Sequence, residues 1–233
     1  MDLPESGNSS GDANDMEPVM PPGSQYSVRL PMAMAYAATQ HAAQVRKDRQ
    51  QTPYIGHPMT VSALVLEHGW GDSRFTGEAE DLAIAALLHD VAEDTGGEEK
   101  IAEIRAMFGT RVADVVQAAS DSLVADASDK APWRIRKEDH VARVTALAAP
   151  DESGQPRDAG ACLVIACDKL HNLTATAAGV ADAGDGHLEL FSGGVAGTRW
   201  YYGAMYAALR PALSPRLSDA IRVQLPLIGA PVE

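Results

Sequence analysis

The chain has 233 residues, of which 45% are hydrophobic and 22% charged, and its formal net charge is −13. This length suits one sizeable core, and the few aromatic residues and alanine-rich stretches favour helices. The negative charge argues against non-specific nucleic acid binding, so an anionic ligand would require a local basic pocket or a metal. No apolar run is long enough to cross a bilayer, and no secretion signal begins the chain. We therefore expect a cytoplasmic protein in which Cys162 and Cys167 are free thiols.

Residues 1–24 are rich in small, polar and acidic residues and in proline, so we expect a disordered tail before a single domain over residues 25–228. Apolar periodicity predicts helices over residues 30–45, 58–69, 81–94, 98–108, 110–119, 133–148, 159–178, 198–210 and 214–224. Six glycines within residues 179–197 indicate a long loop. No segment has the pattern of a strand, and the expected fold class is all-α.

The central stretch is residues 81–95, which begins as an almost wholly apolar helix and ends in ionisable groups. His89, Asp90, Glu93 and Asp94 fill its last turns. Buried charges at the end of a core helix are costly unless they are compensated, and a divalent cation would do so. This stretch therefore predicts a metal site beside a carboxylate pair.

Two further segments carry side chains of the metal-binding type. His57 precedes Pro58 at the expected start of a helix, and Asp168 interrupts a second long apolar run. Together with His89 and Asp90, they would form a mixed nitrogen and oxygen site. Such a site suits Mn²⁺, Fe²⁺, Zn²⁺ or Co²⁺ better than Ca²⁺, and it leaves coordination positions for water and substrate.

The order His57, His89-Asp90, Asp168 resembles the HD superfamily of metal-dependent phosphohydrolases. Residues 41–47 with 53–58, residues 87–95 and residues 168–173 are similar to three motifs of RelA/SpoT-type alarmone hydrolase domains. The resemblance spans about residues 26–210 and implies an HD-type helical bundle. Because few residues follow 210, too few for the nucleotidyltransferase domain of bifunctional relatives, the chain resembles a stand-alone small alarmone hydrolase.

The resemblance implies Mn²⁺-dependent removal of the 3′-pyrophosphate from (p)ppGpp, with His57, His89, Asp90 and Asp168 holding the metal. The metal would activate water, and Glu93, assisted by Asp94, would orient or deprotonate it. The implied substrate-binding residues are Arg46, Lys47 and Asn172. Because so acidic a chain needs cations to hold an anionic substrate, we also expect Lys137, with Arg134 or Arg136, to clamp the pyrophosphate.

Two departures from the family pattern concern the third motif. Ile165 stands where the family usually has lysine, and Lys169 replaces an arginine. They leave open hydrolysis of adenosine alarmones such as (p)ppApp, or of another nucleotide, by the same chemistry. A non-enzymatic nucleotide sensor is a further alternative, although no expected ligand is missing. The sequence leaves the oligomeric state open.

Overall fold

The computed structural model describes Met20, residues 22–48 and residues 50–232. Within them lie ten α-helices and five short 3₁₀ helices, and the expected all-α class is confirmed. The helices are α1 (Arg29–Gln40), α2 (Gly56–Gly69), α3 (Ala79–Leu88), α4 (Val91–Thr95), α5 (Glu98–Phe108), α6 (Thr110–Ala119), α7 (Trp133–Ala148), α8 (Ala159–Ala183), α9 (Gly194–Leu209) and α10 (Pro215–Arg222). Residues 1–19 and 21 of the expected tail lie outside the described residues, so the tail and the domain limits stay predictions.

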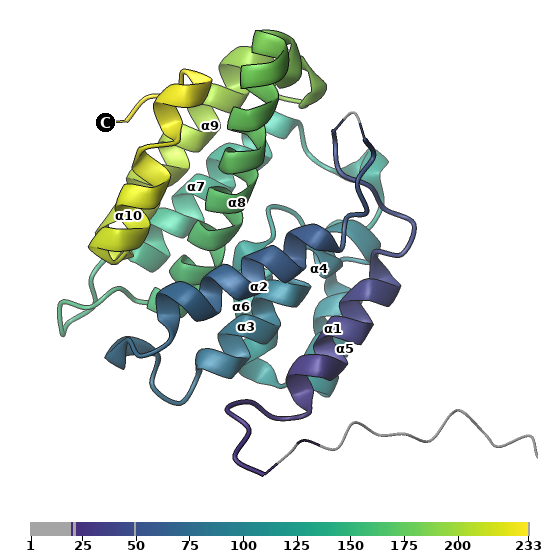
Figure 1. Cartoon of the computed structure of the whole chain (residues 1–233), viewed down its shortest axis with the longest axis vertical. Coiled ribbons are helices and arrows are strands. Elements are labelled where there is room, and N and C mark those ends of the chain that lie inside the picture. Colours follow the sequence, from purple (N-terminus) through teal and green to yellow (C-terminus); the bar gives the residue numbers. More distant parts are fainter. Residues whose placement is uncertain (1–19, 21, 49, 233) are drawn as a thin grey trace, which may run out of the picture.

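Helix α3 forms the centre of the core because its apolar residues are enclosed on every side. Each residue from 82 to 88 is at most 2% exposed. Figure 1 shows α1 to α6 gathered on one side of the molecule and α7, α9 and α10 on the other, with α8 between them. Helix α8 packs against both groups, so one long helix joins the two halves of the bundle.

The expected core helix over residues 81–94 is divided at His89 and Asp90. Helix α3 ends at Leu88, and α4 begins at Val91. The break lies where apolar residues give way to acidic ones, a change that periodicity alone does not resolve into two helices. As a consequence, the two metal-type side chains lie at a bend between helices rather than within one continuous helix.

Two other expected boundaries were wrong. The first helix ends at Gln40, and the chain then forms a narrow loop in which Val45 pairs with Pro53. The glycine-rich segment over residues 179–197 is largely helical, because α8 continues to Ala183 and the 3₁₀ helix Gly184–Leu190 follows. A Cβ added at Gly179 would lie 2.4 Å from the His187 ring, so this glycine serves close packing rather than a loop.

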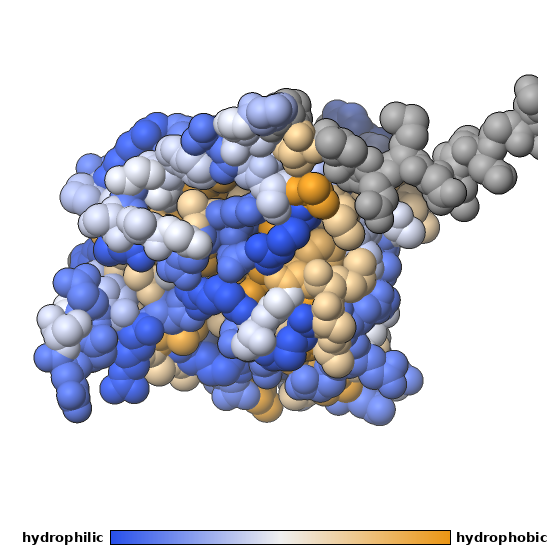
Figure 2. All heavy atoms as spheres, turned by 90° about the horizontal axis from the view of Figure 1, so that it is seen from below, coloured by the Kyte–Doolittle hydropathy of each residue, from blue (hydrophilic) through white to orange (hydrophobic). Residues whose placement is uncertain are grey.

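Figure 2 shows a largely hydrophilic face on which hydrophobic side chains reach the surface in several places. Scattered exposed apolar groups are normal on a globular protein. Within the described residues, no helix has the length and apolar character needed to cross a membrane.

Candidate functional site

Two helix ends and the middle of a third helix bring the four expected metal ligands together. His57 lies in the first turn of α2, His89 and Asp90 lie between α3 and α4, and Asp168 lies within α8. His57, His89 and Asp168 are buried, and Asp90 is part-buried. The packing of α2 and α8 against α3 therefore gathers ligands that lie 111 residues apart from first to last in the sequence.

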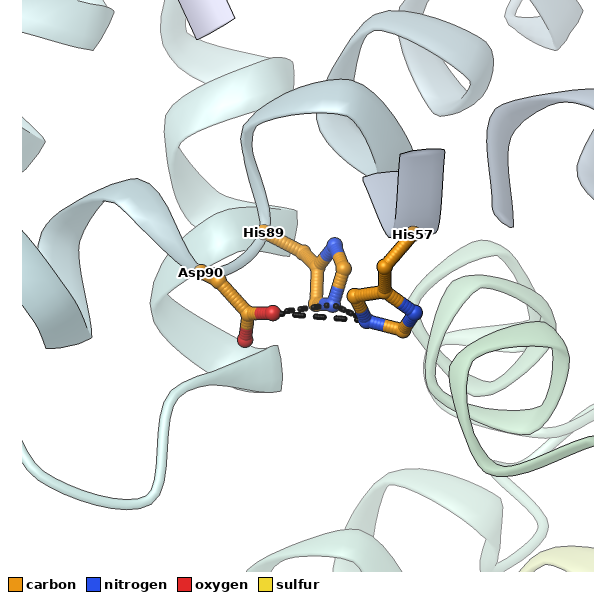
Figure 3. A group of neighbouring side chains, drawn as sticks. All are labelled: His57, His89 and Asp90. Atoms are coloured by element: carbon orange, nitrogen blue, oxygen red, sulfur yellow. Dashed lines mark hydrogen bonds and ion pairs between the residues drawn. The ribbon is translucent and has the colours of Figure 1, made fainter. Parts of the chain in front are cut away.

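The ligand atoms have the spacing that a single bound ion requires. His57 Nε2 lies 3.2 Å from His89 Nε2, 3.4 Å from Asp90 Oδ2 and 3.2 Å from Asp168 Oδ1. His89 Nε2 lies 3.0 Å from Asp90 Oδ2 and 3.5 Å from Asp168 Oδ1. Ligand atoms about 2.1 Å from one cation lie about 3.0–3.4 Å apart in octahedral or tetrahedral geometry. The side chains in Figure 3 point toward a common centre, so this donor set fits a divalent metal.

In His57 and His89, the ring nitrogen Nδ1, which does not face the cluster, has a hydrogen-bond partner of its own. His89 Nδ1 lies 2.8 Å from the carbonyl oxygen of Ala86, which can only accept, so Nδ1 carries the proton and Nε2 is free to bind a metal. His57 Nδ1 lies 2.7 Å from Nδ1 of His171, which stacks on it with ring centroids 5.0 Å apart. Burial, and then the proximity of His57, lowers the pKa of His171 to about 4, so that ring is neutral near pH 7.

The two candidate carboxylate ligands, Asp90 and Asp168, are also held by neighbouring groups. The Tyr54 hydroxyl donates a hydrogen bond of 2.5 Å to Asp90 Oδ2, and Asn172 Nδ2 donates one of 2.5 Å to Asp168 Oδ1. Lys169 Nζ lies 2.6 Å from Asp168 Oδ2. Burial alone would raise the pKa of Asp168, but Lys169 and the facing imidazoles hold that pKa well below its usual range. Asp168 is thus a carboxylate at neutral pH, as metal binding requires.

The expected catalytic pair lies one turn beyond the ligands, on α4. Glu93 Oε2 accepts a hydrogen bond of 3.0 Å from the backbone N–H of Asp121. Burial, followed by the charge of Asp121, raises the pKa of Glu93 to about 7. Burial and the charge of Asp90 raise the pKa of Asp94 to about 6. Both carboxyl groups therefore titrate near physiological pH, which suits groups that exchange protons.

A cavity of about 500 Å³ opens beside the cluster and reaches from the carboxylates to aromatic side chains of α9. Four of the five expected substrate-binding residues line it: Arg46, Lys47, Asn172 and Lys137. Arg46 donates to Asn172 Oδ1 over 3.0 Å, while Lys137 Nζ lies 2.5 Å from Asp121 Oδ2. Arg134 does not line the cavity; it pairs with Glu138 and lies over the Trp200 ring at 3.4 Å.

Sequence reasoning did not single out Asp121 or Tyr54, and it gave Lys169 no role in the site. Asp121 belongs to a polar loop after α6, and its proximity to Glu93 depends on packing between distant segments. Tyr54 lies within the motif of residues 53–58, and Lys169 lies within that of residues 168–173. Their positions in sequence near His57 and Asp168 were the signal that could have placed them in the site. His171 was not singled out either, and it contacts His57.

Comparisons with known proteins bear on this geometry. A family model described as an HD domain matches residues 33–186, which is more than half of the chain. The chain belongs to the HD domain family. The resemblance read from the histidine and aspartate motifs is therefore confirmed, and the HD domain contains all four candidate ligands.

Several relatives carry the name guanosine-3′,5′-bis(diphosphate) 3′-pyrophosphohydrolase MESH1, and two of them illustrate the similarity. The Homo sapiens enzyme is 34% identical over 149 residues, which are 63% of this chain and 69% of that protein. The Danio rerio enzyme is 36% identical over 140 residues, which are 59% of this chain and 63% of that protein. The match with the Danio rerio enzyme therefore spans just under two thirds of its length.

A solved structure, that of a metazoan ortholog of SpoT that hydrolyses ppGpp, shares the fold of this HD domain. The two superpose with a TM-score of 0.62 at 24% sequence identity. The alignment covers 88% of this chain and 98% of the other, so the shared fold extends beyond the residues that the family model matches.

Proposed function

We propose that the protein is a metal-dependent phosphohydrolase that removes the 3′-pyrophosphate of (p)ppGpp, giving GDP or GTP and pyrophosphate. The observation that carries the proposal is the convergence of His57, His89, Asp90 and Asp168 at one end of a cavity, with Glu93 one turn away. The activity named for the MESH1 relatives supports this substrate.

In this proposal, His57, His89, Asp90 and Asp168 hold the metal, and Mn²⁺ is the expected ion. When bound, the metal lowers the pKa of a water molecule and polarises a phosphate oxygen. Glu93 orients the attacking water and takes its proton, because its raised pKa makes it a competent base near neutral pH. Water attacks the phosphorus bonded to the ribose O3′, the P–O3′ bond breaks, and the proton that Glu93 took from the water passes to O3′. Asp94, with a pKa of about 6, assists this proton transfer.

The cationic and amide side chains of the cavity would bind the nucleotide. Arg46 and Lys47 lie on the loop after α1, where Asn172 holds the Arg46 guanidinium. Lys137 and Lys169 lie over the Tyr201 ring, with Nζ atoms 4.8 and 5.5 Å from its centroid, and can meet phosphate oxygens. The predicted role of Arg134 lacks this support, because its guanidinium stacks on Trp200 outside the cavity lining.

A product assay tests the proposal. Protein freed of metal with EDTA is incubated with ppGpp, ppApp or GTP after addition of Mn²⁺, Fe²⁺, Zn²⁺ or Co²⁺, and products are separated by anion exchange. We expect GDP and pyrophosphate from ppGpp, with the highest rate in Mn²⁺. Turnover of ppApp alone would change the base preference and keep the mechanism. Nucleotide binding without turnover in any metal would overturn the enzyme assignment in favour of a nucleotide sensor.

A further inference from the structure

The metal ligand His57 has a second ring nitrogen whose partner is another imidazole. Its Nδ1 lies 2.7 Å from Nδ1 of His171 on α8, and the rings are inclined by 23°. His171 is three residues after the ligand Asp168, so one turn of α8 supplies both a metal ligand and a contact to a second ligand. This pairing is not part of the donor set itself, because Nδ1 of His57 points away from the cluster that Nε2 joins.

When His57 binds a cation, the protons of the His57 and His171 rings can be placed on their nitrogens in one way only. A neutral imidazole that binds a metal through Nε2 must carry its proton on Nδ1. His57 Nδ1–H must then donate, and His171 Nδ1 must accept with its own proton on Nε2. Within the described part of the chain, His171 Nδ1 is the one hydrogen-bond partner of His57 Nδ1. His57 is 1% exposed, so water does not readily replace that acceptor.

We propose that His171 is a positioning residue that selects the metal-binding tautomer of His57 and fixes the direction of its ring. The inference rests on the metal centre of the proposed function but on no nucleotide. Outer groups that hold a metal-ligating histidine in this way contribute about 10–100-fold to metal affinity. His171 is itself half-buried and holds no place among the four converging ligand atoms, so its effect passes through His57.

Two substitutions separate the hydrogen-bond acceptor from the bulk of the ring. His171→Asn places an amide oxygen near the position of Nδ1 and keeps an acceptor, whereas His171→Leu keeps volume and removes it. His68→Leu is the matched control, because His68 lies 11 residues further along α2, about 16 Å from His57 along the helix axis. All three variants are checked for folding by circular dichroism and thermal unfolding.

The experiment measures Mn²⁺ affinity from the free-ion signal in electron paramagnetic resonance, without nucleotide. We expect His171→Leu to weaken Mn²⁺ binding by about 10–100-fold. His171→Asn and His68→Leu should remain close to the unmodified protein. In the Zn²⁺-loaded protein, a slowly exchanging Nδ1 proton of His57 should be visible by nuclear magnetic resonance and should be lost in His171→Leu.

Two results would overturn the inference. An equal loss of Mn²⁺ affinity in His171→Asn and His171→Leu would show that the ring contributes by packing and not as a hydrogen-bond acceptor. An unchanged Mn²⁺ affinity in His171→Leu would show that metal binding does not need His171. Both results leave the proposed hydrolysis standing, since the unmodified protein still binds Mn²⁺. Absence of Mn²⁺ binding by the unmodified protein would instead remove the metal centre, and with it both proposals.

Discussion

The backbone N–H of Asp121 donates to Glu93 Oε2, while the carboxylate of the same Asp121 lies 2.5 Å from both Arg136 and Lys137. Asp121 therefore links the expected general base on α4 to two cations on α7. Its carboxylate is almost fully buried, with 1% of the side chain exposed. Burial would raise the pKa of Asp121, but Lys137 and Arg136 hold it well below its usual range, so the negative charge beside Glu93 persists at all ordinary pH values.

Substitution of Glu93 by glutamine should separate catalysis from metal binding. Glutamine keeps the oxygen that accepts the Asp121 N–H but cannot take a proton from water. We expect kcat to fall by about 10²–10⁴-fold, the usual contribution of a general base, with Mn²⁺ affinity within a factor of about three. Steady-state kinetics and Mn²⁺ titration check this, and loss of the metal together with turnover would contradict the assigned role.

The rate of hydrolysis should depend on pH through the protonation of Glu93. A base works as its carboxylate, so activity should be lost as pH falls through the pKa of Glu93, which is about 7 without a cation. A bound cation beside Asp90 lowers that pKa, so the acid limb of kcat/KM should have its midpoint at or below about 7. A rate that does not change between pH 5 and pH 8 would contradict this assignment.

Asp121→Asn should move that acid limb to lower pH. The negative charge of Asp121 raises the pKa of Glu93, and the positive charge of Lys137 lowers it. The substitution removes the first charge and frees Lys137 from its ion pair with Asp121, and both changes lower the pKa of Glu93. The expected result is a shift of the kcat/KM midpoint below that of the unmodified protein, measured over the same pH range. Glu138→Gln, on the exposed face of α7, is the control and should leave the midpoint unchanged. A shift toward higher pH in Asp121→Asn would contradict the electrostatic explanation.

The candidate metal ligands His89, Asp90 and Asp168 could be singled out from sequence because each lies at an abrupt change of residue type. Asp168 interrupts an apolar run, and His89-Asp90 ends another, so the need for compensation was visible. The contacts of Asp121 and His171 could not be predicted in the same way. They join residues 28 and 114 positions apart, and their geometry depends on how the loop after α6 packs beside α4 and how α8 packs against α2 rather than on local pattern. The break between α3 and α4 could not be predicted, because no glycine or proline marks it in the sequence.

Removal of the metal should lower stability, because the cation compensates a buried cluster of ligands. Burial lowers the pKa of His89, but Asp90 and Asp168 raise it by more, so the pKa lies well above its usual value. A cation that binds His89 must therefore displace a proton. Mn²⁺ at 100 times its Kd should stabilise the protein by about 2.7 kcal/mol and raise its Tm by roughly 5–10 °C. Asp168→Ala should abolish both this shift and hydrolysis. A full Mn²⁺-dependent shift in Asp168→Ala would contradict its assignment as a ligand.

Gly97 should be required for the contact between the segments that carry Glu93 and Asp121. Its φ is +62°, and an added Cβ would lie 2.1 Å from the carbonyl oxygen of Leu123. Gly97→Ala therefore combines backbone strain with a clash against main-chain atoms two residues after Asp121, and it should destabilise the protein by about 2–4 kcal/mol.

Gly96→Ala provides the matched control for that substitution. The φ of Gly96 is 166°, outside the left-handed region, and an added Cβ there meets Cγ of the Lys100 side chain at 2.9 Å rather than main-chain atoms. Urea unfolding measures both variants. We expect the midpoint of Gly97→Ala to fall well below that of Gly96→Ala, and hydrolysis to fall with it, because displacement of Leu123 moves the Asp121 N–H away from Glu93. Equal midpoints for the two variants would show that the loop after α6 yields without cost and that this contact does not fix the position of Glu93.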